Sequence, residues 1–303
     1  MLERIVLPCG YGQTCNQLIV IAHWIPAVLD HGLALYFPDF RRYSRFFGGS
    51  SKQAVPSFPA AAPALNIAEL SLALACARAA RTRCFGNLGV RCCFAAGRLL
   101  PGVRQFAWDG GGASRSKPPR GVVSQTAPRA RSLWVRGWLY RESTFTTRER
   151  AEIKRYFAPV PEIADRVRQF VNRHREPGVA LVGVHLRRGD YRSWLSGRYY
   201  YDDREMANVM IRLRSSLPQR RLRFMLVSNE PVDAALYHGI DIVRGPGDAL
   251  ADLYSLASCD LILGPPSTYT TWASFYGDAP LYHITDTKAP FGPGDFHARH
   301  ECP

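Results

Sequence analysis

The sequence predicts an α/β protein of two domains, each built on a Rossmann-like sheet. Its 303 residues are about twice the usual length of one domain. Residues 1–37 are typical of a strand, a helix and a second strand. From residue 179 onward, short apolar runs alternate with amphipathic segments, as in a doubly wound sheet. We therefore expect an N-terminal domain over residues 1–150 and a C-terminal domain over 151–303.

The N-terminal domain is predicted to open with a βαβ unit. Residues 4–8 and 33–37 are apolar strand candidates, and Thr14 is expected to cap a helix that runs to about residue 30. An alanine-rich stretch predicts a further helix over 66–83. Residues 101–131 are rich in Gly, Pro, Ser and Arg, which predicts a long, flexible surface loop.

The C-terminal domain shows the β/α rhythm more clearly. The run 179–186 is almost continuously apolar, as a parallel strand covered on both faces should be. The remaining predicted strands are 222–228, 241–243, 261–263 and 281–284, and the predicted helices are 202–216, 232–237, 248–258 and 268–276.

The amino-acid composition is that of a globular protein and excludes a disordered or fibrous chain. Apolar residues make up 47% and charged residues 21%, which are ordinary globular values. No apolar run reaches the roughly 20 residues that a bilayer span needs, and the first residues do not resemble a signal peptide. We therefore expect a cytoplasmic protein. None of the eight cysteines forms a C-x-x-C pair, so no zinc or redox motif is predicted.

The net charge of +14 favours anionic partners. The chain contains no RNP, KH or zinc-finger pattern and its arginines are scattered, so we expect no nucleic-acid partner, although a basic nucleic-acid-binding protein stays as an alternative. The predicted loop has two interpretations, a solvated linker or a peripheral contact with the anionic inner face of a membrane. Its basic residues are Arg104, Arg115, Lys117, Arg120, Arg129 and Arg131.

Two segments stand at the carboxyl ends of predicted strands, where open parallel sheets bind ligands. The first is His185-Leu-Arg-Arg-Gly-Asp-Tyr191, in which alternation places His185 and Arg187 on one side. Two adjacent guanidiniums can bind a diphosphate through bidentate hydrogen bonds, which is a phosphate role for Arg187 and Arg188. Asp190 can orient an arginine or act as a base.

The second segment, Gly264-Pro-Pro-Ser-Thr-Tyr-Thr-Thr-Trp272, passes from a strand into a helix. Ser267 and Thr268 are candidate caps for this helix, whose first free amides offer an anion site. Because both segments can bind an anion and both follow strands of one sheet, they predict a shared phosphate site.

The first segment resembles the H-x-R-R-x-D signature of α-1,2- and α-1,6-fucosyltransferases, in particular glycosyltransferase family 11. Gly12-Gln-Thr-Cys-Asn-Gln17 is similar to the family's N-terminal G-x-x-x-N-Q loop, and Trp134-Val-Arg-Gly-Trp-Leu-Tyr140 to its G-Y-[FW] segment. Asp252-Leu-Tyr-Ser-Leu-Ala-Ser-Cys-Asp260 with Ser267-Thr-Tyr resembles a fourth motif, whereas residues 40–130 match poorly.

The resemblance implies a GT-B fold, in which two Rossmann-like domains face a central cleft and the C-terminal domain binds the nucleotide sugar. It implies a GDP-fucose donor, a glycan acceptor such as an oligosaccharide or glycolipid, inversion at the sugar carbon, and no metal or other cofactor. The absence of Asp-x-Asp from the sequence agrees with the last expectation, and the adjacent Asp202 and Asp203 are more simply dipole-stabilising acids at a helix start.

Residue roles follow from position and resemblance. Arg187 is expected on the β-phosphate, while Arg188 either orients the loop or touches the donor. His185, Ser267, Thr268 and Tyr269 are further donor-binding candidates, and Asn16 and Gln17 are substrate-binding candidates from the N-terminal motif.

Two assignments stay open at this point. The base is Asp190, His23 or His185, although an acid beside two cations is a poor base and His185 also fits an orienting role. Asp252 either accepts hydrogen bonds from guanine or is a first-turn acid that favours the helix dipole. Another GDP-linked deoxysugar, and a non-catalytic relative of the transferases, also remain alternatives.

Overall fold

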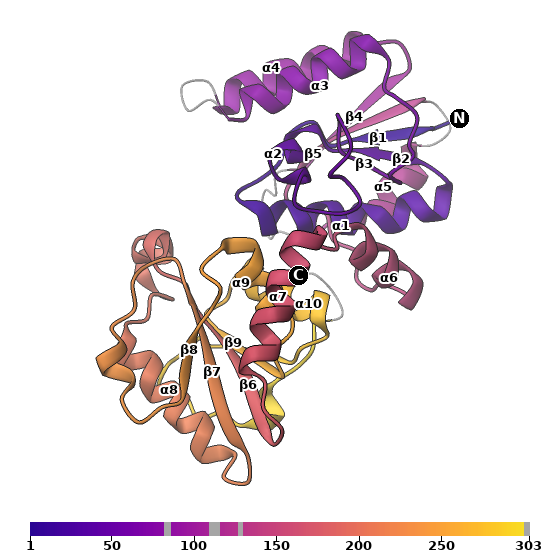
Figure 1. Ribbon diagram of the computed structural model, residues 1–303. Coiled ribbons are helices and arrows are strands. Elements are labelled where there is room, and N and C mark those ends of the chain that lie inside the picture. The colour runs from indigo at the N-terminus through magenta and orange to yellow at the C-terminus, as the bar shows by residue number, and fades with distance from the viewer. Residues whose placement is uncertain (82–85, 109–115, 127–129, 300–303) are drawn as a thin grey trace. The chain divides into compact units, whose positions relative to one another are not determined.

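The computed structural model describes residues 1–81, 86–108, 116–126 and 130–299, which form two units with separate sheets (Figure 1). The first unit is Met1–Val160, and the second begins at Pro161 rather than near residue 151. Helix α6 (Thr147–Tyr156) belongs to the first unit because Tyr156 at its end donates a 2.6 Å hydrogen bond to the carbonyl oxygen of Ser57.

The first unit contains a five-stranded sheet in the order β3-β2-β1-β5-β4. All neighbours are parallel except β2 and β3. The strands are β1 Arg4–Val6, β2 Ala34–Tyr36, β3 Ser57–Phe58, β4 Val103–Trp108 and β5 Ser132–Gly137. Because β1 lies between β2 and β5, its carboxyl end is the point at which the strand order reverses.

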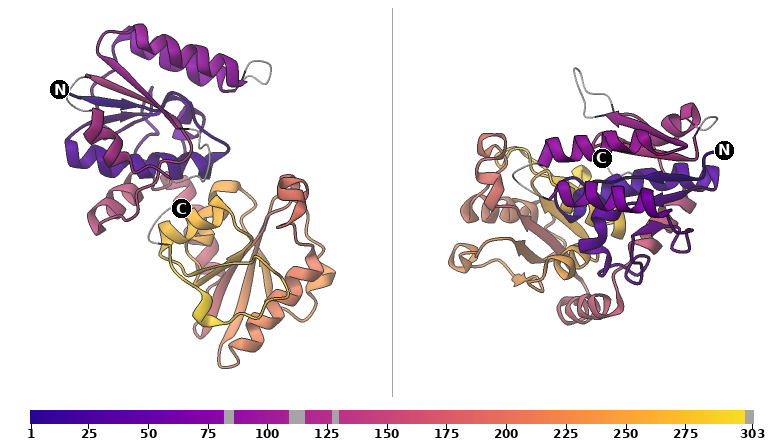
Figure 2. Two further views of the ribbon diagram at one scale, coloured as in Figure 1. Left: turned by 180° about the vertical axis from the view of Figure 1, so that it is seen from behind. Right: turned by 90° about the horizontal axis from the view of Figure 1, so that it is seen from above.

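Helices cover both faces of this sheet (Figure 2). The helices are α1 Thr14–His31, α2 Arg41–Ser44, α3 Ile67–Ala79, α4 Gly86–Ala96 and α5 Pro119–Thr126. Helices α3 and α4 pack on one face, where Ala73, Cys76 and Phe94 join Val6 and Trp134 in one apolar cluster. Helix α1 begins at Thr14 as expected, but its N-cap is Gln13, so the prediction that Thr14 caps it was wrong.

The prediction of a flexible loop over 101–131 was also wrong for the described part of that segment. Strand β4 and helix α5 lie within it, and β4 pairs with β5 along its whole length, from Val103 opposite Ser132 to Trp108 opposite Gly137. Its local composition concealed the strand because β4 is an edge strand in which no residue is buried.

The basic side chains of this segment are largely engaged within the chain. Arg120 forms ion pairs with Asp30, Glu142 and Glu149. Arg131 pairs with Glu3, and the Lys117 ammonium lies 3.9 Å from the centre of the Trp108 ring. Arg104 is exposed, whereas Arg115 and Arg129 lie outside the described residues. The structure therefore does not support the predicted lipid-binding surface.

The second unit contains a fully parallel sheet in the order β10-β9-β6-β7-β8. The strands are β6 Val179–Leu186, β7 Arg221–Ser228, β8 Ile242–Arg244, β9 Leu261–Gly264 and β10 Leu281–His283. In order of appearance this is the 3-2-1-4-5 arrangement of dinucleotide-binding sheets. Strands β6 and β9 are neighbours, so the order reverses between them.

Four helices flank this sheet: α7 Pro161–His174, α8 Asp203–Ser216, α9 Ala249–Leu256 and α10 Thr268–Gly277. Helix α8 supplies Met206, Val209, Met210 and Leu213 to the main core, against the inner residues of β6 and β7. On β6, a Cβ at Gly183 would lie 2.5 Å from a methyl group of Leu256, so glycine here lets α9 approach the sheet closely.

The predicted fold of two Rossmann-like α/β domains is confirmed. The apolar run 179–186 is strand β6 with the same bounds, and the other predicted strands and helices of this half lie within about two residues of the observed ones, although 232–237 forms only a 3-10 turn. In the described part of the chain, no helix is long and apolar enough to cross a membrane.

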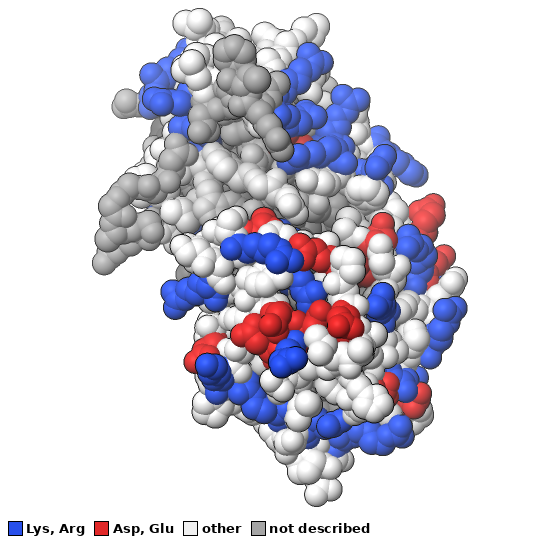
Figure 3. Space-filling model, turned by 90° about the vertical axis from the view of Figure 1, so that its left-hand side faces the viewer, with Lys and Arg blue, Asp and Glu red and all other residues white. Residues whose placement is uncertain are grey.

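Positive charge does not form a continuous band on the face of the second unit that Figure 3 shows, because Asp and Glu side chains lie among the Lys and Arg side chains. Arginines of this unit are also paired within the chain, such as Arg223 with Glu176 and Asp241. This arrangement does not favour the alternative of a nucleic-acid-binding protein.

Candidate functional site

The two segments that sequence singled out leave adjacent strands. Strand β6 pairs with β9, with Val184 opposite Leu263, so their carboxyl ends meet where the strand order reverses. Direct contacts join the two exits. The Tyr191 hydroxyl donates a 2.6 Å hydrogen bond to the carbonyl oxygen of Pro266, and the His185 ring stacks on Tyr269 at 4.9 Å. Ligands of open α/β sheets bind in this crevice.

Arg187 presents its guanidinium at this edge. Its Nη2 pairs with the carboxylate of Asp190 at 2.9 Å, and its Cζ lies 5.5 Å from the centre of the Tyr191 ring. Asp190, whose side chain is 59% exposed, makes the only hydrogen bonds found for this guanidinium among the described residues. Nε and Nη1 are therefore available to a ligand oxygen, and Asp190 orients the arginine.

Arg188 has a different role, although it is the next residue. It is 5% exposed and its Nη2 lies 2.5 Å from the carboxylate of Asp203, while Nη1 donates to the carbonyl oxygen of Pro231. Of the two roles left open by the sequence, these contacts favour orientation of the loop. Only its Nε is buried without a hydrogen-bond partner.

Asp203 is held in the ionised form by this pair. Burial raises the pKa of Asp203, but hydrogen bonds from Arg188 and Tyr237 outweigh it and lower that pKa on balance. The sequence interpretation of Asp203 as a simple dipole-stabilising acid was incomplete. Its neighbour Asp202 is the N-cap of α8 and forms a capping box with Glu205.

Two residues after β7 position the turn at Arg187. Asn229 Oδ1 accepts the amide N–H of Arg188 at 2.8 Å, and Glu230 Oε1 accepts the amide N–H of Gly189 at 3.0 Å. Gly189 has a φ of 59°, which suits glycine, and a Cβ there would lie 2.8 Å from Asn229 Nδ2. The sequence predicts that Asn229 and Glu230 stand at a strand end of the same crevice, but not these two contacts, because the partners are 41 positions away.

His185 is buried and neutral. Burial, with a smaller contribution from the nearby Arg187, lowers its pKa to about 3. Its Nδ1 is buried without a hydrogen-bond partner. A group with this pKa is a weak base near pH 7, so an orienting role fits His185 better than a catalytic one. The unpartnered nitrogen is available to a polar atom of a ligand.

Ser267, Thr268 and Tyr269 form the start of α10, after the strand β9 that pairs with β6. The Ser267 hydroxyl accepts the amide N–H of Tyr269 at 3.2 Å, which confirms Ser267 as the N-cap, and Thr268 is the first helical residue. The Tyr269 hydroxyl donates a 2.6 Å hydrogen bond to the carbonyl oxygen of Ala249. The start of a ten-residue helix therefore opens at the crevice, with its partial positive charge towards an anion.

Asp252 lies in the first turn of α9 and is 7% exposed. Its Oδ1 accepts the amide N–H of Gly247 at 2.9 Å, and burial raises its pKa to about 6. One hydrogen bond does not offset the free-energy cost of burying the Asp252 carboxylate. A favourable interaction with the helix dipole alone therefore explains its burial poorly. Its location after β8 is at the same carboxyl edge of the sheet as Arg187.

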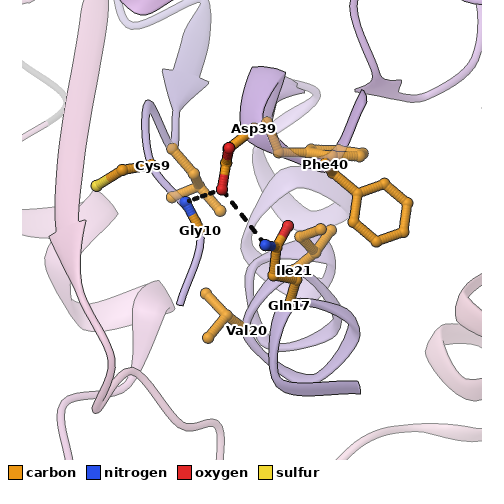
Figure 4. A pocket seen from close by; sticks show the side chains of 9 residues that line it. Cys9, Gly10, Gln17, Val20, Ile21, Asp39 and Phe40 are labelled. Carbon is orange, nitrogen blue, oxygen red and sulfur yellow. Dashed lines mark hydrogen bonds between the residues drawn. The ribbon is translucent and has the colours of Figure 1, made fainter. Parts of the chain in front are cut away.

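In the first unit, Asn16 and Gln17 begin α1, just after the carboxyl end of β1. Gln17 is 2% exposed and its amide donates to Asp39 Oδ2 at 3.3 Å, as does the backbone N–H of Gly10 at 3.1 Å (Figure 4). These residues line a cavity of about 20 Å³, which is the size of a single water site. Gln17 therefore shapes the loop after β1, and Asn16 is partly exposed beside it.

His23 is not at a strand end. It is fully buried within α1, its Nδ1 accepts the amide N–H of Glu142 at 2.9 Å, and its ring packs on Phe145. These contacts assign it to the core of the first unit, so His23 as the base was a wrong alternative. No group of three His, Cys, Asp or Glu side chains among the described residues is arranged to hold a metal ion.

Comparison of the sequence and the structure with known proteins identifies proteins of the same fold. No family model and no curated protein matches the sequence. Many solved structures match most of the chain, and three of them show the likeness. A mutant of FUT1 from Arabidopsis thaliana in complex with GDP has a TM-score of 0.57 and 10% identity, over 98% of this chain and 73% of that one.

The other two are NodZ structures. The fucosyltransferase NodZ from Bradyrhizobium has a TM-score of 0.53 and 16% identity, over 94% of this chain and 96% of that one. NodZ α-1,6-fucosyltransferase soaked with GDP-fucose has a TM-score of 0.54 and 15% identity, over 93% and 94%. The chain therefore has the GT-B-like fold of these fucosyltransferases.

Proposed function

We propose that the protein is a fucosyltransferase that moves fucose from GDP-fucose to a hydroxyl of a glycan acceptor, with inversion and without a metal. The observation that carries the proposal is that Arg187 and the start of α10 follow the neighbouring strands β6 and β9 where the strand order reverses, with Tyr191 in contact with both exits. A guanidinium and helix amides at one edge suit a diphosphate. Support also comes from the fold, which is that of transferases crystallised with GDP or GDP-fucose.

The proposed reaction is one in-line displacement. The acceptor oxygen forms a bond to the anomeric carbon while the bond from that carbon to the β-phosphate oxygen breaks, and the hydroxyl proton passes to Asp190 or to water. The leaving diphosphate carries the developing negative charge. Arg187 Nε and Nη1, together with the first amides of α10, stabilise that charge in the transition state.

The donor assignment includes two finer proposals. Asp252 is proposed to accept the N1–H and the exocyclic amine of guanine, and His185 Nδ1 to bind a polar atom of the donor. Asn16 and Gln17 are proposed to lie on the acceptor side.

Membership of glycosyltransferase family 11 and an α-1,2 linkage stay predictions from the sequence motifs; one matching structure is of an α-1,6 enzyme. Analysis of the product's linkage decides between them.

Nucleotide selectivity tests the donor. We expect GDP to raise the melting temperature by several degrees at about 100 times its Kd, and UDP, CDP, ADP and dTDP to raise it much less. EDTA should leave the GDP shift unchanged. The measurement is a thermal-shift panel confirmed by calorimetry. An equal shift with UDP, or a GDP shift abolished by EDTA, contradicts the proposal.

The pH dependence of GDP binding tests Asp252. Because burial raises its pKa to about 6, the free carboxyl is ionised at pH 7.5 and largely protonated at pH 5. Only the carboxylate accepts both guanine donors, so GDP affinity should fall as the pH decreases through 6. In Asp252→Asn the affinity at pH 7.5 should be about 10-fold to 100-fold lower, and the dependence on pH that is left should be that of the GDP β-phosphate, whose second pKa is about 6.

Inosine diphosphate is the matched control, because it lacks only the exocyclic amine. The wild type should prefer GDP over this analogue, and Asp252→Asn should not. Calorimetry at pH 5, 6 and 7.5 gives both results. A wild-type protein that binds the two nucleotides equally, with the same dependence on pH as Asp252→Asn, assigns Asp252 to the helix dipole alone.

A further inference from the structure

The segment that follows the Arg187 turn carries five aromatic residues between 191 and 201, which is dense for a surface loop. Three of them pack together with tilted rings: Trp194 lies 4.8 Å from Tyr191 and 5.8 Å from Tyr199 between ring centres. We call Tyr191, Trp194 and Tyr199 the aromatic platform. Tyr191 is buried and Tyr199 packs against the core of the unit, whereas Trp194 is 44% exposed and the following Leu195 is 55% exposed.

The backbone holds Trp194 outward. Leu195 and Ser196 have φ values of 48° and 57°, in the left-handed region that side-chain-bearing residues rarely adopt, and Gly197 continues it at 77°. Two consecutive non-glycine residues in this region are unfavourable, and such conformations concentrate at ligand-binding sites. The platform therefore keeps a large aromatic ring in water at a cost in backbone free energy.

A chain of contacts joins the platform to the proposed diphosphate site. The Arg187 guanidinium lies over the Tyr191 ring at 5.5 Å, and Trp194 packs against the same ring. The hydroxyl of Tyr191 binds the loop before Ser267. A ligand on Trp194 is thus one aromatic ring away from the arginine that is proposed to hold the phosphate.

The chemistry of the platform suits a sugar ring. The C–H faces of a pyranose pack on an indole ring, while its hydroxyl groups require polar partners at the edge. Exposed polar side chains surround Trp194, including Ser193, Ser196 and Arg198, and Arg198 already lies over the Tyr199 ring at 5.3 Å. A protein partner needs a much larger apolar surface than Trp194 and Leu195 provide.

We propose that the aromatic platform is an acceptor subsite, on which Trp194 binds a saccharide ring of the glycan that receives the fucose. This inference rests on the proposed function. It assigns part of acceptor recognition to the second unit, beside the donor. Trp194 acts in binding only, and no catalytic step is assigned to it.

The test compares Trp194→Ala with the wild type on a printed glycan array, with GDP present, and measures GDP affinity separately by calorimetry. Leu236→Ala is the matched control, because it removes another exposed apolar side chain (39% exposed) of the same unit. We expect glycan affinity to fall about tenfold in Trp194→Ala and less in Trp194→Phe, with GDP affinity unchanged in all three variants.

The outcomes separate the two proposals. Wild-type protein that does not bind GDP contradicts the proposed function itself. Wild-type protein that binds GDP but no glycan, or that retains its glycan affinity in Trp194→Ala, contradicts the acceptor subsite alone. A fall in GDP affinity in Trp194→Ala also contradicts it, because the platform then belongs to the nucleotide.

Discussion

Arg187→Ala is expected to lower the rate of fucosyl transfer by about 10²–10³ while leaving the fold intact. The reason is that the guanidinium stabilises charge that develops on the leaving diphosphate, and loss of one such contact costs about 2.7–4 kcal/mol of transition-state stabilisation. The side chain is 19% exposed, and its ion pair is with the exposed Asp190, so its removal disturbs little packing. The measurement is kcat for transfer from GDP-fucose, with circular dichroism as the check on folding.

Two variants control this experiment. Arg187→Lys should recover little activity, because an ammonium cannot reproduce the two parallel hydrogen bonds of a guanidinium. Arg221→Ala removes an exposed arginine at the first residue of β7, the opposite end of the sheet, and should have activity near that of the wild type. Turnover of Arg187→Ala within a few-fold of the wild type would falsify the proposed phosphate site.

Asp203→Asn is expected to lower the free energy of unfolding by about 3–5 kcal/mol, because it leaves the buried Arg188 charge without its partner. The side chains of the pair are only 6% and 11% exposed. The contribution also depends on pH. Because the pKa of Asp203 is lowered in the folded state, the stabilisation is present at neutral pH and is lost as the pH falls through that pKa. Urea unfolding at pH 7 and at acidic pH measures both effects.

The double variant Asp203→Asn/Arg188→Met separates charge from packing. Removal of both charges should recover much of the stability lost by Asp203→Asn, because no unpaired buried charge remains. Tyr237→Phe removes only the hydroxyl that donates to Asp203 at 2.7 Å and should cost about 1 kcal/mol. A loss below about 1 kcal/mol in Asp203→Asn excludes the view that this ion pair holds the turn.

The contrast between Arg187 and Arg188 follows from their surroundings. Strand β6 ends at Leu186, so the two arginines leave it on different sides. One side faces the exit of β9 and the Tyr191 ring, which leaves Arg187 donors free. The other side of the strand faces Asp203 and the loop after β7, which bind the guanidinium of Arg188. The same turn thus leaves Arg187 available to a ligand and is held in place by Arg188.

Sequence alone determined those features that depend on short spacings. The apolar run of β6, the strands and helices after it, and the placement of Arg187 and Ser267 at strand ends all follow from local periodicity and from the rule that ligands bind at the carboxyl edge. In the first unit, local composition misrepresented β4, because an edge strand without a buried residue lacks the alternation of buried and exposed positions that identifies a strand.

Only the tertiary structure decided which charges are free. The partners of the Arg187 turn, namely Asp203, Asn229 and Glu230, come from 15 to 41 positions further along the chain, and no local pattern indicates them. The same holds for His23, which burial assigns to the core, and for Trp194, which its backbone keeps in water. Periodicity reports which face of an element is buried, whereas pairing and desolvation depend on which other elements lie against that face, and those are chosen by the folded chain as a whole.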